Sequence, residues 1–157
     1  MNSTIPPDTA MPLAIGSDHA GYALKQHLRR WLEENAIDYT DFGCYAETPS
    51  VDYADFSFRT ATAVSSGLCE RGVVICGTGI GAMITANKVS GVRAALCTTD
   101  YMAEMARRHN DANLIAFGGR TTEPDQAVRM LRLFLDTPFD GGRHLGRIQK
   151  IHRLTGR

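Results

Sequence analysis

The residues with the clearest capacity for chemistry form one short stretch, in which Cys76 precedes three closely spaced glycines, Gly77, Gly79 and Gly81. The β-branched run Val73–Ile75 before the cysteine is typical of a parallel strand that is buried on both faces. Glycines let the backbone turn sharply and approach a ligand closely. The free N–H groups of a helix that starts after such a turn favour negative charge. The stretch therefore predicts a strand, a turn and a helix, with Cys76 activated as a base or nucleophile.

The glycine-rich turn allows two chemical interpretations. Residues 77–82 match the dinucleotide-binding pattern G-x-G-x-x-G with alanine in the last place, and Asp100 follows where a ribose-binding acid is expected. However, the motif belongs to the third strand–helix unit, and little chain remains for a separate catalytic domain. In the second interpretation, the N–H groups of the turn stabilise an oxyanion on a small molecule and Cys76 transfers a proton.

Charged side chains suited to a sugar phosphate lie elsewhere in the chain. Asp18 and His19 follow a short apolar strand, and Arg120 follows another. Arg143 and Arg147 are four residues apart and share one face of a helix, although they also fit a solvated basic surface. Guanidinium groups match the geometry of phosphate oxygens. The sequence thus offers an anion-binding set besides the glycine loop.

Strand-like and helix-like segments alternate along the chain. The strands are expected at 13–16, 37–42, 72–76, 92–97 and 113–117, and the helices at 22–35, 53–67, 82–91, 99–108, 123–135 and from 143 onward. This alternation predicts an α/β fold of three layers, Rossmann-like, with a parallel sheet of about five strands covered by helices on both faces. Ligands bind beyond the carboxyl ends of the strands in such sheets.

The polar pair His109 and Asn110 precedes the last predicted strand instead of following one. We therefore expect these residues in a polar break at the edge of the sheet opposite Cys76. One chain cannot easily bring them into the same site, which suggests that a second subunit supplies them.

Composition excludes several function classes. The chain has 17 basic and 17 acidic residues, which gives no basic patch for nucleic acid, and no apolar run approaches the roughly 20 residues that span a membrane. The four cysteines form no CxxC pair, and no Cys/His spacing indicates a metal site, so reduced thiols and a cytoplasmic location are expected. Residues 1–12 lack the pattern of a secretory signal and are expected to be a flexible tail before a single domain at 13–157.

Six short motifs occur in order from residue 13 to the C-terminus: SDHAG at 17–21, CGTGIG at 76–81, ANK at 86–88, RHNDAN at 108–113, FGGR at 117–120 and GGRH at 141–144. Together they resemble the B-type ribose-5-phosphate isomerases, a family that includes allose- and galactose-6-phosphate isomerases. The resemblance implies an aldose–ketose isomerase that works through an enediolate with neither metal nor cofactor. It implies ribose 5-phosphate as the substrate, with allose 6-phosphate or a four-carbon sugar phosphate as the alternative.

The resemblance also implies roles for individual residues. Cys76 would be the base that moves a proton between C1 and C2, because Ala82 stands where some members carry a glutamate. The remaining roles fall into four groups: Gly77, Thr78, Gly79 and Gly81 for the oxyanion; Asp18 and His109 for ring opening; His19, Arg120, Arg143 and Arg147 for the phosphate; Tyr53 and Asn110 for the sugar. His144, beside Arg143, receives no role.

In the family that the sequence resembles, the active sites lie between two subunits. The resemblance implies that His109, Asn110 and Arg120 come from the partner of a homodimer, and it is compatible with a tetramer. Without it, Cys76 is also explained as an inert buried thiol and His109 as a solvated loop residue. No nucleic acid or membrane partner is expected.

Overall fold

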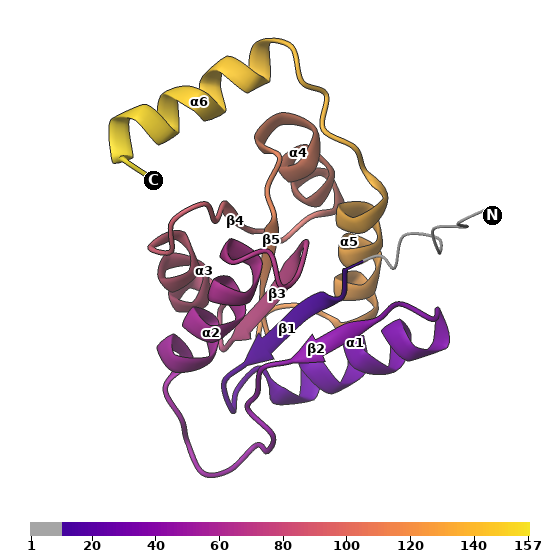
Figure 1. Cartoon of the computed structure of the whole chain (residues 1–157). Coiled ribbons are helices and arrows are strands. Elements are labelled where there is room, and N and C mark those ends of the chain that lie inside the picture. Colours follow the sequence, from indigo (N-terminus) through magenta and orange to yellow (C-terminus); the bar gives the residue numbers. More distant parts are fainter. Residues whose placement is uncertain (1–10) are drawn as a thin grey trace, which may run out of the picture.

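The computed structural model describes residues 11–157 and contains one parallel sheet with strand order β2-β1-β3-β5-β4 (Figure 1). The strands are β1 (Leu13–Ser17), β2 (Tyr39–Asp41), β3 (Gly72–Cys76), β4 (Ala94–Leu96) and β5 (Leu114–Gly118). The helices are α1 (Tyr22–Glu34), α2 (Tyr53–Ser65), α3 (Ile80–Asn87), α4 (Asp100–Asn110), α5 (Pro124–Asp136) and α6 (Arg143–Thr155). The predicted tail lies outside the described residues as far as residue 10, and Met11 and Pro12 lead into β1.

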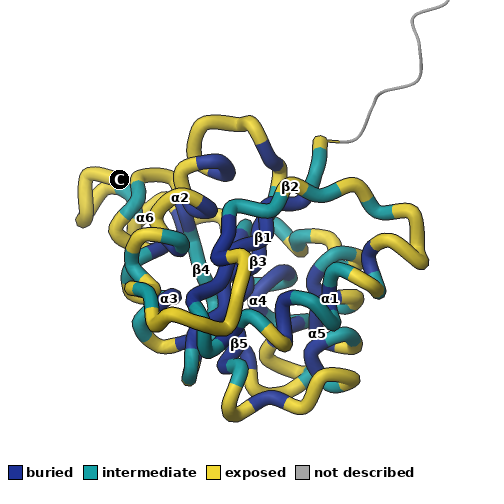
Figure 2. The backbone as a smooth tube through the Cα atoms, turned by 90° about the horizontal axis from the view of Figure 1, so that it is seen from below, coloured by how far each residue is buried: buried dark blue, intermediate teal, exposed yellow. Residues whose placement is uncertain are grey.

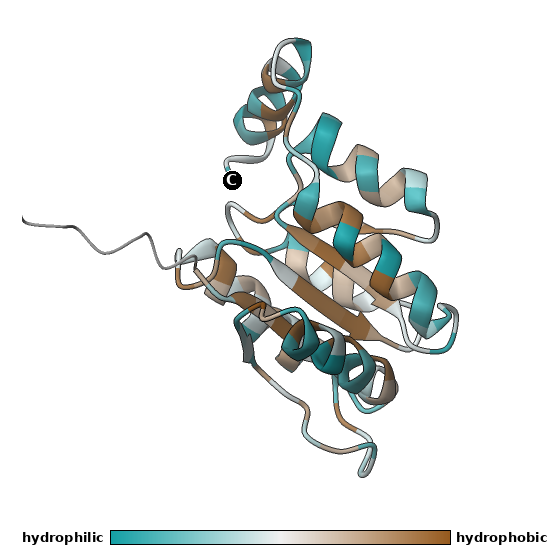
Figure 3. Cartoon of the chain, turned by 90° about the vertical axis from the view of Figure 1, so that its right-hand side faces the viewer, coloured by the Kyte–Doolittle hydropathy of each residue, from teal (hydrophilic) through white to brown (hydrophobic). Residues whose placement is uncertain are grey.

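Alternation along the central strands divides the core into two layers. Val73 and Ile75 of β3 pack with α1, α4 and α5, whereas Val74 and Cys76 pack with α2 and α3. Successive side chains of a strand point to opposite faces, so a strand covered on both faces is apolar throughout. Figure 2 shows the central strands in the dark blue of buried residues, and Figure 3 shows them in the brown of hydrophobic residues. The predicted three-layer α/β fold is confirmed.

The strand order creates a crevice between β1 and β3. From β1 the chain moves outward to β2 at one edge, and from β3 it moves to β4 at the other edge. The connections after β1 and β3 therefore diverge at the carboxyl ends of these strands, where open α/β sheets bind their ligands. Ser17 is level with Ile75, and Cys76 is level with Gly118. The loops after β1, β3 and β5 consequently begin at one edge.

Among the expected boundaries that differ from the structure, one concerns candidate site residues. Helix α4 runs through His109 and Asn110 and ends at Asp111, which adopts a left-handed conformation with φ 44°. His109 and Asn110 thus form the last helical turn, not a polar break. Cationic side chains in this turn favour its continuation, because the carboxyl end of a helix attracts positive charge. At the other end, the Thr99 side chain accepts from the Met102 N–H and caps α4.

Helix α6 lies apart from the sheet and contacts α4 (Figures 1 and 3). Its Leu145, Ile151 and Leu154 side chains are exposed, while Ile148 is buried. Among the described helices, none combines the length and hydropathy needed to cross a membrane.

Candidate active site

Backbone hydrogen bonds tie the loops after β3 and β5 together. The Gly119 N–H donates to the Cys76 carbonyl at 2.8 Å, and the Arg120 N–H donates to the Gly77 carbonyl at 2.9 Å. The loop after β1 joins them through Asp18, whose N–H donates to the Ile75 carbonyl at 3.1 Å. Three loops that are distant in sequence therefore form one surface around the end of β3.

The glycines of these loops are required by close packing. Gly79 has φ +80°, and a Cβ built on it would lie 2.6 Å from Leu96 Cδ1 and 2.8 Å from the carbonyl carbon of Phe117. A Cβ on Gly119 would lie 2.4 Å from the Ala20 carbonyl oxygen. Only glycine satisfies both the left-handed backbone and the contact at position 79. The predicted strand, turn and helix around Cys76 are confirmed.

The Cys76 thiol lies at the carboxyl end of β3, directly before α3. It is 4% exposed, and its Sγ accepts a hydrogen bond of 3.2 Å from the Gly79 N–H. This hydrogen bond holds the sulfur at the glycine loop, beside the amino terminus of α3. The arrangement fits a thiol that serves as a base.

Asp18 and His19 are held beside the crevice by backbone groups. Asp18 is 5% exposed, and its Oδ1 accepts from the Gly21 N–H at 2.9 Å. The Val51 N–H donates to His19 Nδ1 at 3.1 Å, and Ser50 Oγ lies 3.4 Å from Nε2. Nδ1 also lies 3.2 Å from the Val51 carbonyl oxygen, so it accepts from the Val51 N–H in one tautomer and donates to this carbonyl in the other. The connection that precedes α2 thus fixes the orientation of this imidazole.

Tyr53 and Thr78 also lie at the glycine loop. Tyr53 starts α2 and is 43% exposed, and a Cβ on Gly81 would lie 2.6 Å from its ring. The Thr78 side chain is exposed, and its hydroxyl accepts from the Ile80 N–H at 3.4 Å. Both side chains therefore belong to the surface formed by the loop.

Arg120 belongs to this same group, which corrects one expectation. The resemblance implied that Arg120 comes from the partner subunit, but a Cβ on Gly77 would lie 3.2 Å from Arg120 Nη1 of the same chain. The reason is topological, because β3 and β5 are neighbours and Arg120 follows β5 directly. An exposed guanidinium beside the glycine loop suits an anionic ligand.

His109 and Asn110 lie at the opposite end of the strands, as the sequence predicts. They end α4, which leads to Leu114, the first residue of β5, whereas Cys76 is level with the last residue of that strand. A strand of five residues is about 16 Å long. One chain therefore separates His109 and Asn110 from Cys76.

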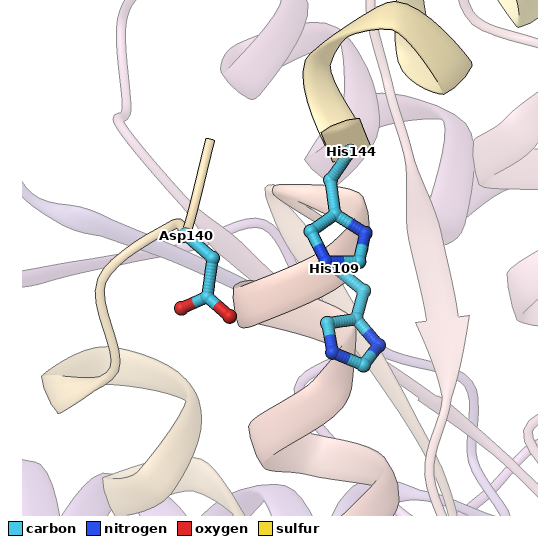
Figure 4. Close-up of side chains that lie close together, drawn as sticks. All are labelled: His109, Asp140 and His144. Carbon is cyan, nitrogen blue, oxygen red and sulfur yellow. The ribbon is translucent and has the colours of Figure 1, made fainter. Parts of the chain in front are cut away.

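Helix α6 begins beside the end of α4. The His144 and His109 rings stack with centroids 4.3 Å apart and an interplanar angle of 11° (Figure 4). Arg143 and Arg147 are exposed on α6. The candidate residues thus form two groups in one chain, one around Cys76 and the other around the junction of α4 and α6.

The same junction brings together possible metal ligands. One ligand atom from each of His109, Asp140 and His144 lies within 4.8 Å of the others. Sequence reasoning gave His144 no role and regarded the histidines as too scattered for a metal site. The available signal was the GGRH motif, which places His144 next to Arg143, but the stack itself depends on how α6 packs on α4.

An apolar cavity of about 550 Å³ lies beside the edge strand β4. Residues of β4, α4 and α6 contribute to its wall, among them Leu96, Met102, Met105 and Ile151. An edge strand next to an apolar hollow is a surface that another chain can cover.

The chain resembles known proteins over nearly its whole described length. A family model described as Ribose/Galactose Isomerase matches residues 13–151. Ribose-5-P isomerase B of Listeria innocua is 42% identical over 144 residues, covering 92% of this chain and 97% of the relative. D-erythrulose-4-phosphate isomerase of Pectobacterium atrosepticum is 37% identical over 141 residues, covering 90% and 93% respectively. The structure of Clostridium thermocellum ribose-5-phosphate isomerase B superposes with a TM-score of 0.91 at 48% identity, covering 93% of this chain and 98% of that one.

Proposed function

We propose that this chain, which belongs to the ribose/galactose isomerase family, interconverts ribose 5-phosphate and ribulose 5-phosphate. The observation that carries the proposal is the hydrogen bond from the Gly79 N–H to Cys76 Sγ. This bond lies within a loop that contacts the neighbouring loops at the crevice between β1 and β3. Relatives named as ribose-5-phosphate isomerase B support the substrate. An aldose and its ketose have the same overall oxidation level, so the reaction requires no external redox cofactor.

Cys76 acts as the base in this proposal. Its thiolate removes the proton from C2 of the open-chain aldose, and the electron pair passes into the C1 carbonyl. The resulting oxyanion accepts hydrogen bonds from the N–H groups of the loop at Gly77, Gly79 and Gly81, with Thr78 beside them. The Cys76 thiol then returns a proton to C1, while a proton moves from O2 to O1 and leaves a ketone at C2.

The other side chains bind and prepare the substrate. Asp18 and His109 open the furanose ring, and Tyr53 and Asn110 line the sugar. The phosphate is bound by His19, Arg120, Arg143 and Arg147. Asp18, His19, Tyr53 and Arg120 lie in the group around Cys76, which supports their participation in one site.

A second subunit completes this site. His109, Asn110, Arg143 and Arg147 lie at the far end of the strands from Cys76 of their own chain. The apolar cavity beside β4 and the exposed apolar side chains of α6 support coverage by a second copy. We therefore propose a homodimer with shared active sites, from which a tetramer can be built. The four free cysteines support a cytoplasmic location.

Mixed dimers test the shared site directly. Cys76→Ala chains are expected to be inactive alone and His109→Ala chains to turn over only slowly, but mixing and exchanging their subunits should restore about a quarter of the fully active sites. Half of the dimers would be mixed, and each would contain one site with both side chains intact. A mixture that gains no activity after proven subunit exchange contradicts the model.

The role of Cys76 has its own test. Cys76→Ala should abolish turnover and leave the binding of ribose 5-phosphate, measured by calorimetry, almost unchanged, because a base acts mainly in the transition state. Cys69→Ala is the matched control, since Cys69 is buried before β3, outside the glycine loop. Near-normal turnover of Cys76→Ala would remove the assignment.

A four-carbon or six-carbon aldose phosphate remains the alternative substrate. The relative named D-erythrulose-4-phosphate isomerase supports a four-carbon sugar phosphate. Measurement of kcat/KM on four-, five- and six-carbon aldose phosphates with a chelator present distinguishes these substrates. We expect the highest value for ribose 5-phosphate. If NAD raises the melting temperature of the protein and no sugar phosphate does, the dinucleotide interpretation of residues 77–82 is favoured instead.

A further inference from the structure

The stacked pair at the junction of α4 and α6 is not explained by the roles proposed so far. His109 lies in the last turn of α4, and His144 lies in the first turn of α6. The His144 side chain is buried, at 6% exposed, whereas His109 is half-buried. Figure 4 shows the two rings one above the other, with the Asp140 carboxylate to one side. The inner ring of the pair therefore supports the outer one.

The geometry favours stacking over metal binding. Nitrogen lone pairs lie in the plane of an imidazole ring, so two rings inclined by only 11° direct them along parallel lines instead of toward one ion. Asp140 is also engaged, because both of its carboxylate oxygens lie 3.2 Å from Arg108 Nε. Arg143 and Arg147 add positive charge near His144. The cluster is thus better explained by contact between the rings.

The surroundings also keep His144 uncharged near neutral pH. Burial lowers the pKa of His144, and the positive charges of His109, Arg143 and Arg147 act in the same direction, against a smaller opposing effect of Asp140. The position of His144 in the first turn of α6 disfavours a cation as well. A neutral ring can stack on His109 whether or not His109 carries a proton, since a cation is attracted to a neutral aromatic face.

We propose that His144 is a positioning residue, whose ring holds the imidazole of His109 by stacking and sets its orientation toward the substrate. This inference rests on the proposed function, in which His109 opens the sugar ring. Because His144 shares α6 with Arg143 and Arg147, the stack fixes the ring-opening group relative to the phosphate-binding side chains. Removing the His144 ring frees His109 to leave its productive orientation.

Three variants test this role: His144→Ala, His144→Phe and the double variant His109→Ala/His144→Ala. A small error in the position of a reacting group can reduce a rate by about 100-fold. We expect His144→Ala to reduce kcat for ribose 5-phosphate by about 10- to 100-fold. His144→Phe keeps a face for stacking and should remain within about threefold of the wild type. The double variant should be no slower than His109→Ala alone, because His144 acts through His109.

Each outcome supports or refutes the proposal. Independent losses that multiply in the double variant, or an unaltered His144→Ala, would show that His144 does not act through His109. A His144→Phe variant as slow as His144→Ala would refute stacking. If His144→Ala fails to fold, the comparison of His144→Phe with its combination with His109→Ala still decides.

A measurement without turnover separates this proposal from the proposed function. The NMR signal of the His109 Hε1 proton should shift in His144→Ala, because the ring current of His144 is lost, and shift back toward its wild-type position in His144→Phe. An unchanged signal refutes the stack. By contrast, if the two variants show these shifts but the wild-type protein turns over no aldose phosphate, only the proposed function is refuted.

Discussion

The packing of the glycine loop leads to a prediction about Gly79 that contains its own control. Gly79 and Gly67 have nearly the same left-handed backbone, with φ of +80° and +78°. A Cβ on Gly79 would collide with Leu96 and with the backbone of Phe117, whereas a Cβ on Gly67 meets nothing within 4 Å. Alanine at both positions therefore separates the cost of the backbone conformation from the cost of the contact.

The expected magnitudes follow from these two costs. A left-handed alanine costs about 1–2 kcal/mol, and the loss of freedom in the unfolded chain offsets about 0.4–1 kcal/mol of this. Gly67→Ala should thus lower the free energy of unfolding by about 1 kcal/mol. Gly79→Ala adds overpacking against backbone, which costs about 1–3 kcal/mol, for a total of about 2–4 kcal/mol.

Urea unfolding of both variants, at equal m-values, measures this difference. Gly79→Ala should also lower kcat, because relief of the clash moves the N–H that donates to Cys76 Sγ. Gly67→Ala should retain wild-type kcat. Equal destabilisation by the two substitutions, or a Gly79→Ala enzyme with wild-type kcat, would refute the argument that contact at this loop requires glycine.

Three further predictions concern buried groups. Lys25 is fully buried and donates to Asp41 Oδ1 at 2.7 Å. Lys25→Met should therefore lower the free energy of unfolding by about 2–4 kcal/mol, whereas Lys88→Met, at an exposed lysine, should lower it by less than about 0.5 kcal/mol. Similar chemical-denaturation midpoints for the two variants would contradict this. Burial raises the pKa of the Cys97 thiol to about 12. Mass spectrometry should therefore find Cys97 unalkylated after the folded protein is treated with iodoacetamide at pH 8. Rapid labelling of Cys97 would contradict this prediction. The pKa of His144 is lowered in the folded chain, so the unfolded chain binds a proton at this imidazole more readily. The free energy of unfolding of the wild type should therefore fall relative to that of His144→Phe as the pH decreases below about 6.5. Parallel pH profiles of the two unfolding free energies would disprove this prediction.

Local pattern was sufficient for the central parts of the fold. The run Val73–Ile75 indicated a strand buried on both faces, and the glycines after it indicated the turn, because both signals come from neighbouring residues. The far position of His109 also followed from order alone, since a segment that precedes a parallel strand lies at its amino-terminal end. These predictions required no knowledge of side-chain packing.

Other features depended on contacts between distant segments. Arg120 lies beside Gly77 because β3 and β5 are neighbours, whereas chain order alone does not place β5 between β3 and β4. The stack of His144 on His109 requires a particular docking of α6 on α4, and the sequence of neither helix specifies it. The sequence does not predict the extension of α4 through Asn110, because the polar pair His109 and Asn110 is typical of a break, although only Asp111 leaves the helical conformation.

The separation of the candidate residues between the two ends of the sheet has a consequence for how activity depends on concentration. A folded chain on its own contains Cys76 and the glycine loop but positions His109 at the far end of the strands. Under the proposed shared site, specific activity should fall on dilution below the dissociation constant of the dimer, while circular dichroism remains that of a folded protein. The amount of enzyme in a cell would then set the activity per molecule as well as the number of molecules.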